Sequence, residues 1–185
     1  MRRCSISLIA LILLLPPCDV RSEEGKWFTT IYYGLHSSTA LDRTLEFRAP
    51  PDSNAFAGVG LGRELIRWKY ASLEVEGILG EHFGGSGNYQ QYAVALGLRY
   101  HYFPWDKYVK TTVAVSDGPS YATRQIEGEN RYLMNLLGLE LTLAYPPYDW
   151  LNVVLGIQHR SGAKSTLHIA NGDSNFYVFG LRGSF

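Results

Sequence analysis

The sequence predicts an all-β fold, an eight-stranded antiparallel transmembrane β-barrel, and three observations lead to this prediction. Segments of about ten residues alternate between two kinds of side chain, as strands with a lipid face and an inner face do. After residue 22 the chain has no apolar run of the roughly 18 residues that a membrane-spanning helix needs. Its 13 tyrosines and 19 glycines suit aromatic girdles and a crowded inner wall.

Residues 1–22 are expected to be a secretory signal, because two arginines precede an apolar run that is too short to span a bilayer. Cleavage after Ser22 would leave residues 23–185 as a single outer-membrane barrel domain. A lipoprotein signal ending at Cys18 is the alternative, but a proline stands where a small residue is expected before the cysteine.

Composition excludes two classes of exported or binding protein. Both cysteines lie within the expected signal, so the remaining chain is not a disulfide scaffold. Losing the signal removes three arginines and one aspartate, which leaves 14 basic and 16 acidic residues of the original 17 and 17. This balance argues against nucleic acid as a partner.

The eight expected strands are residues 26–36, 55–65, 71–80, 89–103, 108–116, 131–145, 151–161 and 175–185. In the first four, apolar and aromatic side chains alternate with glycine, threonine or charged residues. The sixth has leucines on one face and Glu140 on the other. The seventh places Leu151 opposite Asn152, and the eighth ends on an aromatic residue, Phe185. Such an aromatic C-terminus resembles the assembly signal of outer-membrane proteins.

Connection lengths are expected to alternate between long and short. The long loops follow the first, third, fifth and seventh strands, as residues 37–54, 81–88, 117–130 and 162–172. The short turns carry Trp68, Pro104-Trp105 and Pro146-Pro147. Since outer-membrane barrels place short turns in the periplasm, the end of the seventh strand is expected at the outer leaflet.

The inner face is expected to be filled by paired charges. The acidic set is Glu64, Glu74, Glu76 and Glu140, and the basic set is Arg99, Lys110, Arg160 and Arg182. Eight strands leave an interior that side chains fill, and buried charges must pair, which predicts a barrel without a pore. A soluble lipocalin-like barrel is the rival, with the same alternation turned inside out.

Candidate catalytic residues stand where the seventh strand ends. His159 and Ser161 share a face with Leu151, Val153, Leu155 and Ile157, which is the face expected to contact lipid. At about 3.3 Å per residue their Cβ atoms lie about 6.6 Å apart, so an imidazole can reach toward the hydroxyl as a general base. Asp173, with the same outward parity on the next strand, could orient the imidazole. The alternative is that all three are polar residues where strands leave the membrane.

At these residues the chain resembles the outer-membrane lipid A 3-O-deacylases, the PagL family. The shared pattern is His159-Arg160-Ser161 with an acidic residue, Asp173, fourteen positions past the histidine. The family has glutamate where Asp173 stands and asparagine where Gly162 stands. The second difference leaves the Gly162 backbone N–H as the oxyanion donor from that position.

The resemblance implies hydrolysis of the ester-linked hydroxyacyl chain at position 3 of lipid A, the anchor of lipopolysaccharide in the outer leaflet. Ser161 would be the nucleophile, His159 the base and then the acid, and Asp173 the orienting residue. No cofactor is expected, and no metal, because His36 and the loop pair Glu81-His82 are scattered. Family precedent allows a homodimer. The rivals are a structural or adhesion barrel of the OmpA or OmpX type and an acyltransferase of similar size.

Overall fold

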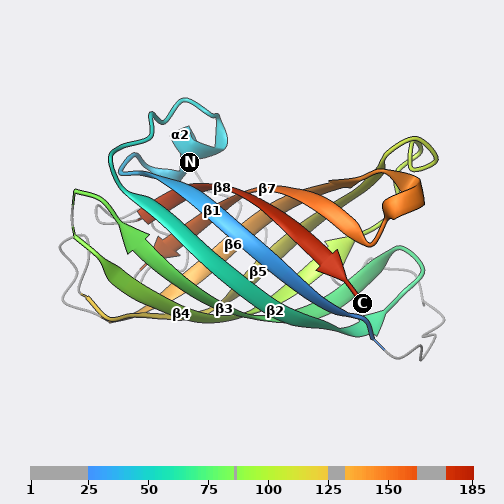
Figure 1. Ribbon diagram of the computed structural model, residues 1–185. Helices are drawn as coiled ribbons and strands as arrows, with labels where there is room; N and C mark the ends of the chain where they lie inside the picture. The colour runs from blue at the N-terminus through green and yellow to red at the C-terminus, as the bar shows by residue number, and fades with distance from the viewer. Residues whose placement is uncertain (1–24, 86, 125–131, 162–173) are drawn as a thin grey trace, which may run out of the picture.

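The computed structural model is a closed antiparallel barrel in which each strand pairs with its neighbours in chain order (Figure 1). It describes residues 25–85, 87–124, 132–161 and 174–185. The strands are β1 (Trp27–Ser37), β2 (Ala55–Arg67), β3 (Ala71–Phe83), β4 (Tyr89–Tyr100), β5 (Lys110–Ala122), β6 (Leu133–Ala144), β7 (Leu151–Ser161) and β8 (Ser174–Ser184). A short helix, α2 (Leu41–Leu45), follows β1, and a 3₁₀ turn, η1 (Pro146–Tyr148), precedes β7. The predicted fold is confirmed. The expected signal at residues 1–22 lies outside the described residues.

The barrel closes because β1 pairs with β2 on one side and with β8 on the other. Trp27 and Phe185 exchange two backbone hydrogen bonds of 3.1 and 2.9 Å at the end of this seam. No strand of the closed sheet is therefore left with an unpaired edge, as a membrane-spanning sheet requires. None of the helices among the described residues is long and apolar enough to cross a membrane.

Three strands, β2, β3 and β5, are longer than the sequence suggested, and the expected alternation of loop lengths is wrong in one place. β3 continues to Phe83, so only residues 84–88 join it to β4, whereas residues 101–109 join β4 to β5. β5 continues through Gly118-Pro119. The sequence predicts a loop for these two residues, because proline has no N–H to donate to a sheet. Gly118 and Pro119 have no pairing partner on β4, but both still pair with residues of β6. Pairing with one neighbour overrides the local turn preference.

The outer surface is an apolar band with aromatic residues near both ends. Exposed aliphatic side chains recur at alternate positions, among them Ile31, Leu61, Leu96, Val153 and Leu181. Exposed aromatic residues mark the end of the barrel where β1 begins and β8 ends, namely Trp27, Tyr100, Tyr102, Trp105, Tyr108, Tyr145, Tyr148 and Trp150. Tyr33, Tyr92, Tyr121 and Tyr132 are exposed toward the other end. This arrangement of a lipid band between girdles is that of membrane barrels and not of a lipocalin-like one.

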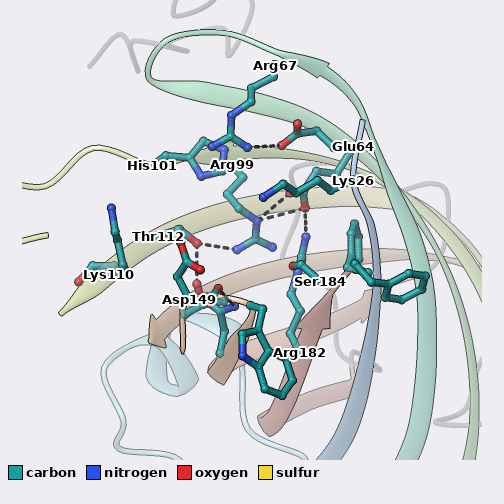
Figure 2. A pocket seen from close by; sticks show the side chains of 17 residues that line it. Lys26, Glu64, Arg67, Arg99, His101, Lys110, Thr112, Asp149, Arg182 and Ser184 are labelled. Atoms are coloured by element: carbon teal, nitrogen blue, oxygen red, sulfur yellow. Dashed lines mark hydrogen bonds and ion pairs between the residues drawn. The ribbon is translucent and has the colours of Figure 1, made fainter. Parts of the chain in front are cut away.

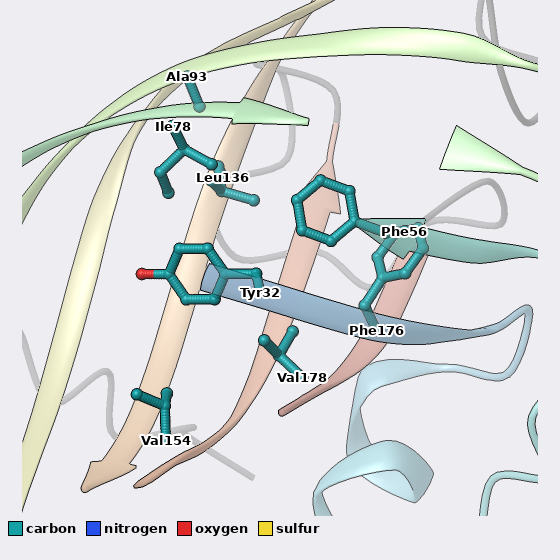
Figure 3. Packing of buried hydrophobic residues seen from close by; sticks show 8 residues of the cluster. All are labelled: Tyr32, Phe56, Ile78, Ala93, Leu136, Val154, Phe176 and Val178. Atoms are coloured by element: carbon teal, nitrogen blue, oxygen red, sulfur yellow. The ribbon is translucent and has the colours of Figure 1, made fainter. Parts of the chain in front are cut away.

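The interior has an apolar part and a charged part. A cluster of Tyr32, Phe56, Ile78, Ala93, Leu136, Val154, Phe176 and Val178 fills the part toward the end of β7 (Figure 3). The Phe56 ring fits because Gly80 stands beside it, where any Cβ would collide with the ring. The Tyr32 hydroxyl donates to the Glu76 carboxylate at 2.8 and 2.9 Å, and so joins this cluster to the charged part.

The charged part confirms the expected pairing for four of the eight inner charges, namely Glu74, Glu140, Arg99 and Arg182. Of the others, Glu64 pairs instead with Arg67, Glu76 accepts from Tyr32, Lys110 is exposed, and Arg160 donates to the Met134 sulfur. The Arg99 guanidinium donates to Glu74 at 3.1 Å and to Glu140 at 2.6 Å, and Arg182 donates to Glu74 at 2.7 Å. These groups border a cavity of about 310 Å³ at the end of the barrel where β1 begins and β8 ends (Figure 2). The network fills the lumen with compensated charge instead of a pore.

Alternate residues of β7 should report opposite sides of the wall. Val153 is 49% exposed on the outer surface, whereas Val154 is 1% exposed inside. In a background without other cysteines, Val153→Cys should react with a lipid-phase maleimide and Val154→Cys should not. Labelling would be measured by mass shift in vesicles. The opposite pattern would mean that the register is shifted by one residue, which turns every side chain to the other face.

Candidate functional site

The candidate site lies on the outer surface of the barrel where β7 ends. In the ladders His159 pairs with Leu137 of β6 and with Asn175 of β8, and Ser161 pairs with Asn135 of β6. His159 and Ser161 therefore share the outward face with Leu151 and the other lipid-facing residues, as the period of two predicted. Gly162 and Asp173, the other two predicted site residues, lie outside the described residues.

The expectation that this whole face contacts lipid is wrong at its last three positions. Ile157, His159 and Ser161 are only 7%, 9% and 8% exposed, whereas Val153 is 49% exposed. Beside them lies a segment of the long connection after β1, which sequence periodicity does not place and which contacts Asn175 and Tyr177 of β8. The structure therefore encloses the two polar side chains instead of presenting them to the membrane.

This covering segment, residues 38–54, contains α2 and runs beside β7 and β8 (Figure 1). Its Phe47 stacks on Tyr177 of β8, with ring centroids 5.8 Å apart and planes inclined by 14°. Tyr177 pairs with Ile157, so the stack borders the candidate site. Phe47 itself is 79% exposed and has a φ of 56°, a left-handed conformation that few bulky residues adopt.

Sequence reasoning missed Asn175, the residue that contacts His159 in the structure. The two side chains face each other across the β7–β8 ladder, with His159 Nδ1 2.8 Å from Asn175 Oδ1. The asparagine Nδ2 donates to the backbone carbonyl of Thr39 at 2.7 Å. Asn175 also has the outward parity assigned to Asp173, but only the strand register shows that it lies directly opposite the histidine.

A second polar group lies at the same end of the barrel but on the inner face. The His36 Nδ1 is 2.6 Å from Asp52 Oδ2, and its Nε2 is 3.1 Å from Ser174 Oγ. The backbone N–H of Asn54 donates to Asp52 Oδ1 at 2.8 Å. The hydroxyl of Ser174, the imidazole of His36 and the carboxylate of Asp52 thus form a hydrogen-bonded series of the kind that activates a serine nucleophile. Ser174 is, however, fully buried. Sequence reasoning did not bring these residues together.

The expected loop position of His82 is wrong. It belongs to β3, is 2% exposed, and its Nε2 lies 2.7 Å from Gln91 Oε1. Its ring stacks on Tyr89, with centroids 4.3 Å apart. Within the described ranges, no group of three or more histidine, cysteine or acidic side chains is arranged to hold a metal ion.

The charged cavity is separate from the candidate site. It is lined from the first residues of β1, β5 and β7 and the last residues of β2 and β8, so it opens at the opposite end of the barrel (Figure 2). Its side chains are engaged with one another, as in the contacts of Arg99 with Glu74, Glu140 and Thr112. We assign it to filling the lumen and not to chemistry at His159.

Comparison with known proteins supports the fold. The barrel is similar to the outer membrane enzyme PagL, with a TM-score of 0.62 at 13% sequence identity over 84% of this chain and 97% of that one. It is also similar to Neisserial surface protein A (NspA), with a TM-score of 0.54 at 11% identity over 86% and 97%. No family model and no curated protein sequence matches the chain. This protein is therefore an eight-stranded barrel of the outer-membrane type.

Proposed function

We propose that this outer-membrane barrel hydrolyses a carboxylic ester of a membrane lipid at the outward-facing end of β7. The observation that carries the proposal is the hydrogen bond between His159 and Asn175. His159 lies two positions before Ser161 on the same face of β7. A histidine with one ring nitrogen engaged is oriented, and an oriented histidine is what a serine nucleophile requires. His159 and Ser161 are buried, and removal from water strengthens electrostatic interactions.

In the proposed reaction Ser161 Oγ attacks the ester carbonyl carbon while His159 Nε2 accepts the hydroxyl proton. The tetrahedral oxyanion collapses, the bond to the alcohol oxygen breaks, and His159 returns the proton to that oxygen. Water, deprotonated by the same imidazole, then attacks the acyl-enzyme and releases the fatty acid and Ser161. The Gly162 backbone N–H is the proposed oxyanion donor, and Asp173 remains a prediction as an orienting residue.

The proposed substrate is lipid A of the outer leaflet, cleaved at the hydroxyacyl ester of position 3. Its support is the His-x-Ser and acidic pattern in the sequence, together with a fold shared with the enzyme PagL. The site lies on the outward face of β7, beside the apolar band, so a lipid that reaches it need not leave the bilayer. The mechanism uses no cofactor, and a homodimer stays a prediction.

A second candidate function is a non-enzymatic surface barrel, and one observation favours it. His159 and Ser161 are 9% and 8% exposed, so a lipid ester reaches them only if the covering segment moves. The fold is also shared with NspA, whose name describes it as a surface protein. The two candidates differ in whether a covalent acyl-enzyme can form.

Trapping the nucleophile would separate these candidates. The protein in detergent micelles, treated with a long-chain fluorophosphonate, should gain one adduct on Ser161, because an activated serine attacks phosphorus as it attacks an ester carbon. Trypsin places Ser161 in the peptide that ends at Lys164 and Ser174 in the next one, which ends at Arg182, so mass spectrometry distinguishes them. An adduct on Ser174 would show that the nucleophile is Ser174, in the group with His36 and Asp52, and not Ser161. The absence of any adduct would favour the surface barrel.

A further inference from the structure

We propose that Asn175 is a positioning residue that holds His159 as the Nδ1–H tautomer and leaves Nε2 as the basic nitrogen. Its catalytic meaning rests on the proposed function, but the tautomer itself follows from the hydrogen bonds alone. A neutral amide would then do what serine hydrolases usually assign to a carboxylate.

The orientation of the Asn175 amide is set by the covering segment. The side chain is fully buried, and its Nδ2 donates to the Thr39 carbonyl oxygen at 2.7 Å. A carbonyl oxygen only accepts hydrogen bonds, so the NH₂ group must face Thr39. The reverse orientation would bring two acceptor oxygens together in a buried place, which costs the desolvation of both.

The amide orientation in turn decides where the histidine carries its proton. With Nδ2 turned to Thr39, the atom that faces His159 Nδ1 is Oδ1, at 2.8 Å. Since an amide oxygen only accepts, Nδ1 must be the donor, and a neutral imidazole then has its lone pair at Nε2. That nitrogen is the one a nucleophilic serine needs as its base.

Thr39 is itself held in place by hydrogen bonds, so the contacts that orient Asn175 continue into the covering segment. The Thr39 backbone N–H donates to Ser37 Oγ at 3.3 Å, and the Ser37 hydroxyl donates to Thr39 Oγ1 at 3.1 Å. At the other end of the segment, the Asp52 N–H donates to the His36 carbonyl at 2.9 Å. The segment that covers the site is thus also the part that sets the tautomer.

Two substitutions of Asn175 separate a positioning role from a merely structural one. Asn175→Ala removes both hydrogen bonds, whereas Asn175→Asp keeps an acceptor for His159 and loses the donor to Thr39. If Asn175 positions the imidazole, kcat for release of the fatty acid should fall about 10- to 100-fold in the alanine variant, with KM little changed. The aspartate variant should recover most of the loss, and the acid limb of its pH–rate profile should move up by about one pH unit. Equal losses in both variants would show that the contact with Thr39 matters and would overturn the positioning role.

The tautomer can be measured whether or not the protein is an esterase. In ¹⁵N-histidine-labelled protein in micelles, nitrogen chemical shifts distinguish Nδ1–H from Nε2–H, and His159→Asn identifies the signal. We expect Nδ1–H in the wild type and a shift toward Nε2–H in Asn175→Ala. An Nε2–H wild type, or a tautomer that responds to Asp173→Asn and not to Asn175→Ala, would overturn the assignment. An inactive wild type with the Nδ1–H tautomer would reject the esterase and support the assignment.

Discussion

Ser161→Ala and His159→Asn should each abolish release of the hydroxyacyl chain, with rates lower by on the order of 10⁴-fold or more. The double variant should be little worse than either single one, because losing either partner already removes the activated nucleophile. Lipid A from an outer membrane that contains each variant, measured by mass spectrometry, should keep its full mass. Lipid A beside the wild type should lose one hydroxyacyl chain.

A matched control comes from Ser120 of β5, a buried serine whose side chain lies inside the barrel and not on the outward face that carries His159 and Ser161. Ser120→Ala should retain activity, and all four variants should still show the heat-dependent gel mobility of folded barrels. Intact lipid A beside the wild type, in cells and with purified protein in detergent, would contradict the esterase and leave the surface barrel. Additive losses in the double variant would mean that His159 and Ser161 do not act as one unit.

Arg99→Ala should lower the free energy of unfolding by about 3–5 kcal/mol, the usual cost of breaking a buried ion pair from one side. Arg99 is 5% exposed and contacts two carboxylates, so its loss leaves Glu74 with Arg182 alone and Glu140 without its 2.6 Å partner. Unfolding in urea, followed by tryptophan fluorescence in lipid vesicles, would measure the change. The activity of correctly folded protein should persist, since this network lies at the opposite end of the barrel.

The control for this measurement is an ion pair on the surface. Arg48 and Glu46 are 3.1 Å apart with side chains 78% and 57% exposed, so Arg48→Ala should change stability by less than about 1 kcal/mol. If Arg99→Ala matched this control, water from the neighbouring cavity would be replacing the guanidinium. The interior charges would then contribute little to holding the barrel together.

The arrangement of the covering segment shows where sequence reasoning ends. Residues 37–54 read as a long polar loop, and no periodicity indicates that Phe47 would stack on Tyr177, 130 positions away. The burial of His159 and Ser161 is likewise not encoded by the alternation of their own strand, which places them on the outward face. The extension of β5 through Pro119 has a similar origin, because the ladder with β6 outweighs a local turn signal.

By itself, the sequence determined the eight strands, their two faces and the shared outward face of His159 and Ser161. These follow from a period of two within single segments, a local property that needs no knowledge of neighbours. Tertiary structure alone decided that Asn175 faces His159, that Thr39 orients Asn175, and that His36 meets Asp52 and Ser174. Each of these contacts depends on the register between strands or on a long connection folding back, so it is the result of many distant interactions that no short stretch of residues encodes.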